Sequence, residues 1–217
     1  MTPKQAGTDS QIRAHAQHLA SLIRKQFELP DLVPALYRLV AAGQPVTIDQ
    51  LATYGGWSSQ QVRAELAHHP GVDWDDHDHD RVLGFGLTLP PTPHRFAFDG
   101  RTVYAFCASD ALMFPVLLGR PGRIESTCPA TAQPIHVDLT PDAVAATDPA
   151  RAVVTRIRPD HAVTDVRSEI CSLGNFFHSP DAATEWLNHT PHGTVVTVED
   201  DFLTTRLAAI DLGWTTT

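Results

Sequence analysis

The sequence predicts an α+β fold: a winged-helix-like module of three helices, then a mixed, mainly antiparallel sheet domain with flanking helices. Apolar residues recur at helical spacing through the first third of the chain, whereas short apolar runs bounded by turn residues dominate the middle. Strands and helices then mix without the regular alternation of βαβ units, which disfavours a doubly wound sheet. We place the boundary between the two parts near Leu89, giving an N-terminal domain over 1–89 and a second domain over 90–217.

The composition is that of an ordinary globular protein with its own core. Of its 217 residues, 42% are hydrophobic and 19% are charged, which is close to the usage of soluble domains. With 16 Lys plus Arg against 25 Asp plus Glu, the formal net charge is -9. Binding to nucleic-acid phosphates needs clustered cations, so this balance argues against nucleic acid as a partner.

The cellular compartment follows from the absence of targeting signals and from the cysteines. No stretch is apolar for long enough to cross a bilayer, and the polar N-terminus lacks the apolar centre of a signal peptide. We therefore expect a cytoplasmic protein without a membrane partner, in a compartment where thiols stay reduced. Three cysteines do not fit a disulfide framework. They are structural fillers, metal ligands or reactive groups.

The first segment predicts two helices in succession. The first 10 residues look disordered, and apolar residues from Gln11 onward recur at the spacing of a helix. Pro30 interrupts that pattern, and a second apolar stripe begins at Leu32. Gly43 ends this second helix, because glycine commonly follows a helix C-terminus.

Two shorter helices follow, joined by a glycine turn. Thr47 is placed to cap the first of them, and Ser58 or Ser59 is placed to cap the second. Gly55-Gly56 separates the two. This arrangement predicts a helix-turn-helix.

A polar hairpin completes the N-terminal module. Residues 72–89 predict two short apolar strands around the tip DWDDHDHD. The tip lacks the glycine and terminal glutamate of a calcium loop, and it has no regular histidine spacing for zinc. We interpret it as a solvated tip. The proline-rich PPTP at 90–93 is then a linker.

The second half opens with a hairpin that runs directly into a helix. Aromatic and apolar residues flank Asp99-Gly100, which is a strong hairpin signal. A helix is expected over 107–119, broken by Pro115. Later elements are expected as strands at 123–127, 134–140, 150–157 and 193–200, and as helices at 179–190 and 200–213.

Cys107 stands where the second strand of this hairpin turns into the helix. A helix start stabilises a thiolate through its free N–H groups and its dipole. Asp110 lies three residues on, so helical spacing places both side chains on one face. A soft nucleophile beside a carboxylate suits proton-coupled chemistry at a soft centre. On spacing alone, a buried thiol beside a first-turn acid is the simpler explanation.

The other two cysteines differ in their surroundings. Cys171 lies in SEICSLGNFF, which looks like a loop, and loops carry reactive groups more often than cores do. A buried thiol is again the alternative. Cys128 follows a strand, precedes Pro129, and has no acidic or basic partner close in sequence. We interpret Cys128 as structural.

Two segments carry a resemblance to a known family. VYAFCASDALMFPVLLGRPGRIESTCPATAQPI closely resembles the active-site region of the organomercurial (alkylmercury) lyases, and so does TDVRSEICSLGNFFHS. The order of helix-turn-helix, LGFGLTL, aromatic hairpin, Cys-x-x-Asp and distal cysteine is similar to that family from about residue 30 to 212. Members often carry a second cysteine where this chain has Ser172, and a tryptophan where it has Phe106.

The resemblance implies roles for individual residues. Cys107 and Cys171 fall on the two catalytic cysteines of the family, Asp110 falls on its catalytic aspartate, and Cys128 matches a structural cysteine. The implied reaction is protonolysis of a carbon–mercury bond. It releases a hydrocarbon and leaves Hg(II) on the two thiolates, with mercury contacting Cys107, Cys171 and Asp110 as substrate and product.

The same resemblance implies the partners and the geometry. The substrate is a small organomercurial, and the role is mercury resistance and detoxification. No organic cofactor is required, and cellular thiols or mercuric reductase accept the Hg(II). One ion shared by two sulfurs places the sulfurs of Cys107 and Cys171 roughly 4–5 Å apart. Apolar side chains such as Phe106, Met113 or Phe176 are expected to wall the site.

Two other functions remain open from the sequence. A winged-helix regulator could sense a metal through its thiols, and a noncatalytic homologue could hold mercury without turnover. The net charge of -9 and the single cation, Arg63, in the second helix of the helix-turn-helix argue against a DNA-binding regulator. The acid at position 110 favours the lyase. We expect the N-terminal module to be a scaffold that covers the pocket.

Overall fold

The computed structural model describes residues 8–158, 161 and 163–215. Most of the segment expected to be disordered, residues 1–7, lies outside this part. Residues 8–10 are ordered, so that expectation is wrong for them. Thr8 caps helix α1 (Asp9–Gln26): its hydroxyl oxygen accepts a hydrogen bond from the backbone N–H of Gln11. The side-chain oxygen of Gln11 in turn accepts a hydrogen bond from the backbone N–H of Thr8. This reciprocal pair satisfies two free backbone donors and starts the helix two residues early.

The predicted helix-turn-helix is confirmed. After α2 (Leu32–Val40), the helices α3 (Ile48–Gly55) and α4 (Ser59–Ala67) follow in succession. Thr47 caps α3 and Ser58 caps α4, each through the same reciprocal bond with a glutamine three residues on. Between them, Gly56 adopts a left-handed conformation with φ 72°.

The predicted hairpin also forms, but its strands continue into a larger sheet. Strands β2 (Asp73–Asp75) and β3 (Asp78–Phe85) pair around an exposed tip. Gly86 then turns the chain into β4 (Leu87–Thr88), which pairs with β3 on one side and with β6 (Arg101–Ala105) on the other. One sheet therefore joins the helical module to the rest of the chain.

This sheet is antiparallel throughout its path, with the strand order β1-β3-β4-β6-β5-β7-β8-β9. A smaller antiparallel sheet has the order β11-β10-β12. The remaining strands are β1 (Val46–Thr47), β5 (His94–Phe98), β7 (Gly122–Thr127), β8 (Pro134–Leu139), β9 (Val144–Asp148), β10 (Val153–Ile157), β11 (Phe176–Phe177) and β12 (Gly193–Thr197). The predicted α+β class is confirmed.

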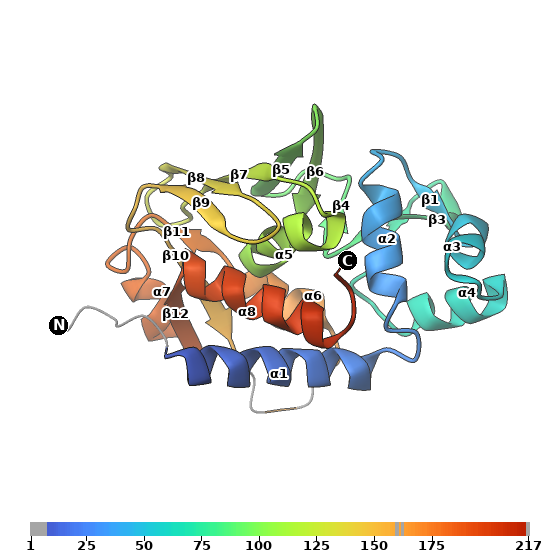
Figure 1. Cartoon of the computed structure of the whole chain (residues 1–217), viewed down its shortest axis with the longest axis horizontal. Helices are drawn as coiled ribbons and strands as arrows, with labels where there is room; N and C mark the ends of the chain where they lie inside the picture. Colours follow the sequence, from blue (N-terminus) through green and yellow to red (C-terminus); the bar gives the residue numbers. More distant parts are fainter. Residues whose placement is uncertain (1–7, 159–160, 162, 216–217) are drawn as a thin grey trace.

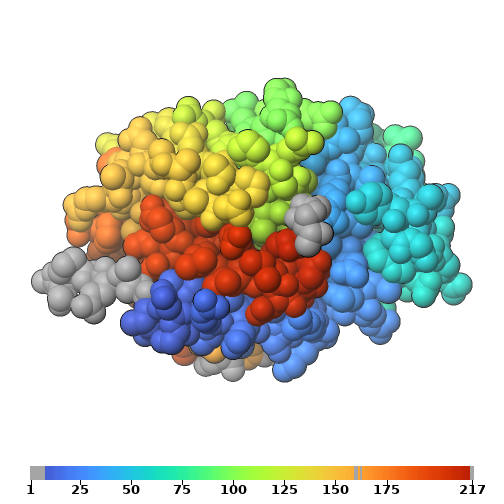
Figure 2. Space-filling model, viewed as in Figure 1, coloured from blue at the N-terminus to red at the C-terminus, as the bar shows by residue number. Residues whose placement is uncertain are grey.

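Three helices pack together over the sheets. Helix α5 (Ala108–Leu118) lies against α8 (Val198–Asp211), and α1 runs along the other side of α8 (Figure 1). In the space-filling view, α1 and α8 form one continuous face below the sheet (Figure 2). Small side chains allow the close approach of α1 and α8: Ala16 and Ala20 pack on Ala208. Within the described part of the chain, no helix is both long and apolar enough to span a bilayer.

Two expectations, one about a helix and one about the end of a strand, are wrong. The helix at 107–119 is not broken by Pro115, because α5 continues to Leu118 with almost every residue buried. Burial of this apolar helix outweighs the missing N–H of one proline. The last strand ends at Thr197 instead of reaching residue 200, because Thr197 caps α8 through the backbone N–H of Asp200.

The expected helix at 179–190 is also shorter than predicted. Only α7 (Thr184–His189) forms there, after a turn. Several short elements carried no sequence signal, among them β9, β11, α6 (Val166–Glu169) and the 3₁₀ turn η1 (Cys171–Leu173). Each is five residues or fewer, too short for a hydrophobic period to emerge.

Candidate active site

Cys107 is the N-cap residue of α5, and this position fixes its geometry. Its backbone is extended, with φ -145° and ψ 172°, and its thiol accepts a hydrogen bond from the backbone N–H of Asp110 at 3.3 Å. The same thiol donates to Oδ2 of the Asp110 carboxylate at 3.1 Å. The pair predicted from the three-residue spacing therefore forms. The helix N-terminus also favours negative charge on the Cys107 sulfur.

Cys171 reaches this pair through a tight turn. It is the first residue of η1, directly after α6. Gly174 ends that turn, and its carbonyl accepts a hydrogen bond from the N–H of Ala108 at 3.0 Å. A Cβ atom on Gly174 would lie 3.1 Å from the Cβ of Cys107. The glycine thus allows the segment carrying Cys171 to lie against the start of α5.

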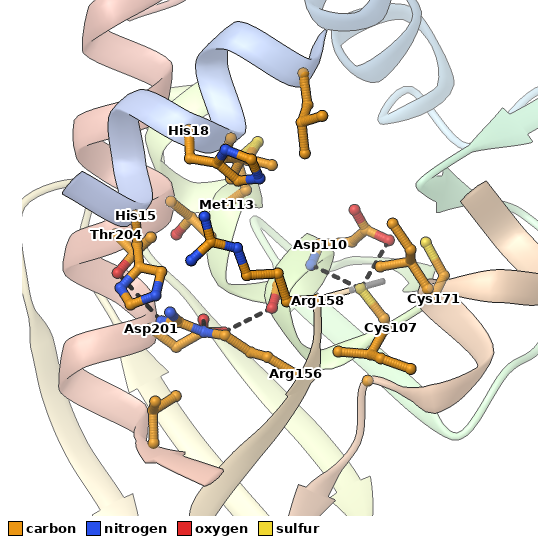
Figure 3. A pocket seen from close by; sticks show the side chains of 18 of the residues that line it. His15, His18, Cys107, Asp110, Met113, Arg156, Arg158, Cys171, Asp201 and Thr204 are labelled. Carbon is orange, nitrogen blue, oxygen red and sulfur yellow. Dashed lines mark hydrogen bonds and ion pairs between the residues drawn. The ribbon is translucent and has the colours of Figure 1, made fainter. Parts of the chain in front are cut away.

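The three predicted residues meet in one cluster, in which both cysteines are buried and Asp110 is half-buried. The ligand atoms of Cys107, Asp110 and Cys171 all lie within 4.8 Å of one another, which confirms the predicted approach of the two sulfurs. The two cysteines are 5% and 7% exposed. Figure 3 shows Asp110 and both cysteines together, with Met113 on the same helix. Among the described residues, this is the one group of three or more His, Cys, Asp or Glu side chains close enough together to hold a metal ion.

Burial and the neighbouring groups raise the pKa of both thiols in the cluster. A hydrogen bond to Cys171, together with burial and the nearby Asp110, holds the pKa of the Cys107 thiol well above its usual range. The same hydrogen bond lowers the pKa of Cys171, although burial and Asp110 outweigh it and leave that pKa raised. The pKa of each thiol is therefore above that of an exposed cysteine.

Burial also raises the pKa of Asp110. Hydrogen bonds from the thiols of Cys107 and Cys171 oppose this rise, because they favour the carboxylate. Asp201 adds a nearby negative charge and raises the pKa further. A carboxyl group in this setting can take up a proton and give it back more easily than an exposed one.

The cluster opens into a cavity of about 970 Å³. Helix α1 supplies an apolar wall through Leu19, Leu22 and Ile23, and Met113 lines the cavity beside the cluster. The predicted role of Met113 in the wall is thus confirmed. The size and lining suit an organic group next to the sulfurs.

Phe106 and Phe176, which were expected beside Met113, are not among the described residues that line the cavity. The Phe106 ring instead carries the guanidinium of Arg167, which lies 4.0 Å from the ring centroid. Phe176 is fully buried in the core and packs edge-on against His94. The expectation was wrong for both, because the Phe106 ring packs against Arg167 and the Phe176 ring packs in the core.

Arg167 connects the cysteine-bearing turn with the hairpin of the N-terminal module. Its guanidinium forms an ion pair with Asp73 on β2, and Asp73 also accepts a hydrogen bond from the Thr88 hydroxyl at 2.6 Å. The positive charge of Arg167 opposes part of the rise that burial causes in the pKa of Cys171. Arg167 lies within the segment that resembles the family, but nothing in that segment singled it out.

A second polar group lies deeper along the cavity. Asp201, at the start of α8, is 1% exposed and forms an ion pair with Arg156. Ser109 donates a hydrogen bond to the Asp201 carboxylate at 2.8 Å, and Arg156 donates one to the Thr204 hydroxyl at 3.1 Å (Figure 3). These bonds tie the first turn of α5 to the first turn of α8 and so hold the cluster on a rigid base.

Cys128 lies apart from the cluster. It is fully buried in the turn between β7 and β8, where its backbone N–H bonds to the carbonyl of Gln133 at 2.9 Å. It is not in the group formed by the other two cysteines and Asp110. Of the predicted solvated tip at 73–80, residues 76–80 are exposed as expected. The expectation is wrong for residues 73–75, which are half-buried, because Asp73 pairs with Arg167 and Thr88.

Tyr37 is a site residue that sequence reasoning missed. It lies on α2, is 3% exposed and lines the cavity. Burial first, and then the negative charge of Asp110 and the two cysteines, hold the pKa of its phenol well above the usual range. The available signal was a single tyrosine hydroxyl within the otherwise apolar run LVPALY.

Two family descriptions match the chain. The family described as alkylmercury lyase matches residues 87–209, and the helix-turn-helix domain of alkylmercury lyase matches residues 25–86. The alkylmercury lyase of Bacillus cereus is 42% identical over 172 residues, which are 79% of this chain and 78% of that protein. The alkylmercury lyase of Streptomyces lividans is 39% identical over 196 residues, which are 87% of this chain and 90% of that protein.

A solved structure has the same fold. The crystal structure of the mercury-bound form of MerB2 superposes with a TM-score of 0.73 and covers 94% of this chain and 99% of that chain. Its sequence identity is 21%, so this likeness concerns the fold alone. The sequence matches span both the helical module and the sheet domain, at about 40% identity to proteins of nearly the same extent. The chain therefore belongs to the alkylmercury lyase family.

Proposed function

We propose that this chain cleaves the carbon–mercury bond of organomercurials by protonolysis, with Cys107, Cys171 and Asp110 as its catalytic residues. The observation that supports this most directly is the cluster of two buried thiols and one carboxyl group within 4.8 Å of one another. Mercury is a soft ion that prefers thiolates to oxygen or nitrogen ligands. The apolar cavity beside the cluster gives the organic group a place to bind.

The first step is capture of the substrate by Cys171. Because the Cys107 thiol donates to Asp110, we assign the first attack to Cys171, which gives up its proton to solvent as it binds mercury. The thiolate attacks mercury in R–Hg–SR′ and forms a new sulfur–mercury bond. The carrier leaves as R′S⁻ and takes a proton from solvent, so that one thiol replaces another on the metal.

The second step adds Cys107 to the same ion. Its thiol lies 3.1 Å from Oδ2 of Asp110, which is close enough for direct proton transfer. As the proton moves to Asp110, the Cys107 sulfur binds mercury. Two sulfur donors raise the electron density at mercury, and the carbon bonded to it becomes more like a carbanion.

The third step is transfer of that proton from Asp110 to the carbon. The Hg–C bond breaks, its electron pair forms the C–H bond, and the hydrocarbon leaves. Asp110 returns to its carboxylate form, and Hg(II) stays on the two sulfurs. Burial raises the pKa of Asp110, which allows the carboxyl group to hold the proton between the two transfers.

Product release requires an acceptor for Hg(II), and we propose that cellular thiols or mercuric reductase supply it. No organic cofactor enters the scheme. Because the mechanism needs free thiols, we also propose that the protein acts in the reducing cytoplasm. In this scheme the helical module is a scaffold that covers the cavity and does not bind nucleic acid.

The test is release of benzene from phenylmercury acetate in the presence of excess thiol, measured by gas chromatography. Cys107→Ser and Cys171→Ser should each reduce benzene to the level of buffer alone, because one sulfur does not weaken the Hg–C bond enough. Cys128→Ser is the matched control, since it removes the cysteine that lies apart from the cluster. Normal cleavage by a folded Cys107→Ser or Cys171→Ser variant would contradict the proposal.

A further inference from the structure

Tyr37 brings a polar group of the helix-turn-helix module to the cavity that holds the reacting cluster. It lies on α2, seventy positions before Cys107 in the chain, yet it lines the same cavity as both cysteines and Asp110. Its side chain is 3% exposed. A phenol this deeply buried needs a hydrogen-bond partner. Asp110 lines the same cavity, and its carboxyl group acts on the Tyr37 phenol.

Packing on two sides confines the Tyr37 ring. The ring meets the edge of Phe114, one turn after Asp110 on α5, with centroids 5.4 Å apart and planes at 84°. Gly86 lies against the hydroxyl, and a Cβ atom on Gly86 would come within 1.9 Å of the Tyr37 oxygen. The carbonyl of Gly86 also accepts the N–H of Phe106 at 2.8 Å. The pocket for the hydroxyl is therefore built from backbone next to Cys107.

The chemistry of Asp110 gives this contact a consequence. One carboxylate oxygen, Oδ2, already accepts the thiol of Cys107. In the proposed reaction the carboxyl group must receive a proton from that sulfur and then deliver it to carbon. Both transfers depend on the orientation of the carboxyl plane. A neutral phenol is a donor that can hold that plane without competing for the proton.

We propose that Tyr37 is a positioning residue for Asp110: its buried hydroxyl donates to the carboxyl group and holds it in line with Cys107 and the mercury-bound carbon. This inference rests on the proposed function. It also gives the helix-turn-helix module a part in the reaction, through one atom.

The first test is Tyr37→Phe, which removes only the hydroxyl and keeps the ring between Gly86 and Phe114. We expect kcat for benzene release to fall about tenfold, the order of one hydrogen bond to a charged group, with KM nearly unchanged. Loss of a donor to the carboxylate raises the pKa of Asp110 further. The acid limb of kcat/KM should therefore move to higher pH. Tyr54→Phe, at an exposed tyrosine on α3, is the matched control.

The second test displaces the Tyr37 hydroxyl by adding a side chain at Gly86. Gly86→Ala should displace the Tyr37 oxygen and reproduce the fall in kcat. Gly86 has φ 75°, so any side chain there also strains the backbone. Gly56→Ala carries the same strain at φ 72° with open space around it, and it should cleave phenylmercury as the natural chain does.

A third measurement does not require turnover. The infrared C=O band of protonated Asp110, identified by its loss in Asp110→Asn, reports the pKa of that carboxyl group directly. We expect the band to persist to higher pH in Tyr37→Phe. A natural chain that releases no benzene would refute the proposed function, while the infrared band would still test the Tyr37–Asp110 contact. An unchanged kcat or an unchanged band in folded Tyr37→Phe would overturn the inference about Tyr37.

Discussion

His94 makes the stability of this protein sensitive to mild acid. It begins β5, is 2% exposed, and pairs through Nδ1 with the Ser126 hydroxyl at 2.9 Å. Its ring packs edge-on against Phe176, with centroids 5.7 Å apart. Burial lowers the pKa of His94 from 6.5 to about 4, because the imidazolium would lose its hydration without gaining a carboxylate.

The sign and the size of the effect follow from this shift. The unfolded chain binds a proton at His94 as the pH falls below 6.5, whereas the folded chain does not until about pH 4. The contribution of His94 to the free energy of unfolding is therefore complete above pH 6.5. It falls between pH 6.5 and about pH 4, and it changes no further at lower pH. Each pKa unit is worth about 1.4 kcal/mol, so the complete loss is about 3 kcal/mol and the loss at pH 4.5 is about 2 kcal/mol.

The assay is urea unfolding at pH 7 and pH 4.5, followed by tryptophan fluorescence. His94→Gln keeps a hydrogen bond to Ser126 but has no group to protonate. Between the two pH values, the natural chain should lose about 2 kcal/mol more of its free energy of unfolding than this variant does. His77→Gln, at the exposed hairpin tip, is the control and should follow the natural chain. Equal losses in the natural chain and in His94→Gln would refute the reasoning.

Three further outcomes follow from the described features. Asp110→Asn should abolish benzene release yet raise Tm, because burial raises the pKa of Asp110 and its carboxylate destabilises the fold above that pKa. The gain in Tm should be a few degrees, since about 1 kcal/mol shifts Tm by roughly 2–4 °C in a chain this long. The gain should vanish below about pH 3.9, where the carboxyl group is protonated in the unfolded chain as well. Cys128→Ser should lower the free energy of unfolding by about 1 kcal/mol while folded protein still releases benzene, as chemical denaturation and the cleavage assay would show together. The chain should show no salt-dependent binding to random duplex DNA at micromolar protein in fluorescence anisotropy, and such binding would contradict a helical module that does not bind nucleic acid.

Local signals allowed much of the fold to be predicted. The caps at Thr47 and Ser58 lie where the sequence places them, because an N-cap and its partner three residues on form one short-range unit. The pairing of Cys107 with Asp110 follows from the same spacing at the start of α5. Each of these features depends on side chains within one helical turn.

Contacts between distant segments could not be predicted in this way. The approach of Cys171 to Cys107 depends on Gly174 and on the pairing of β10 with β11, which local sequence does not encode. The family resemblance supplied that pair, but it did not point to Tyr37 on α2. Pro115 shows the converse case, in which tertiary burial overrides a strong local signal.

The two-residue strand β4 makes the helical module and the sheet domain poor candidates for independent inheritance. Leu87 pairs with Phe85 on one side and with Ala105 on the other, and Thr88 likewise has partners on both sides. A recombination event at this point would leave open backbone edges on both fragments. The ion pair of Arg167 with Asp73, which joins the cysteine-bearing turn to the hairpin of the helical module, would be lost as well. Functional exchange among relatives is therefore expected to transfer both halves as a matched pair, so that they diverge together.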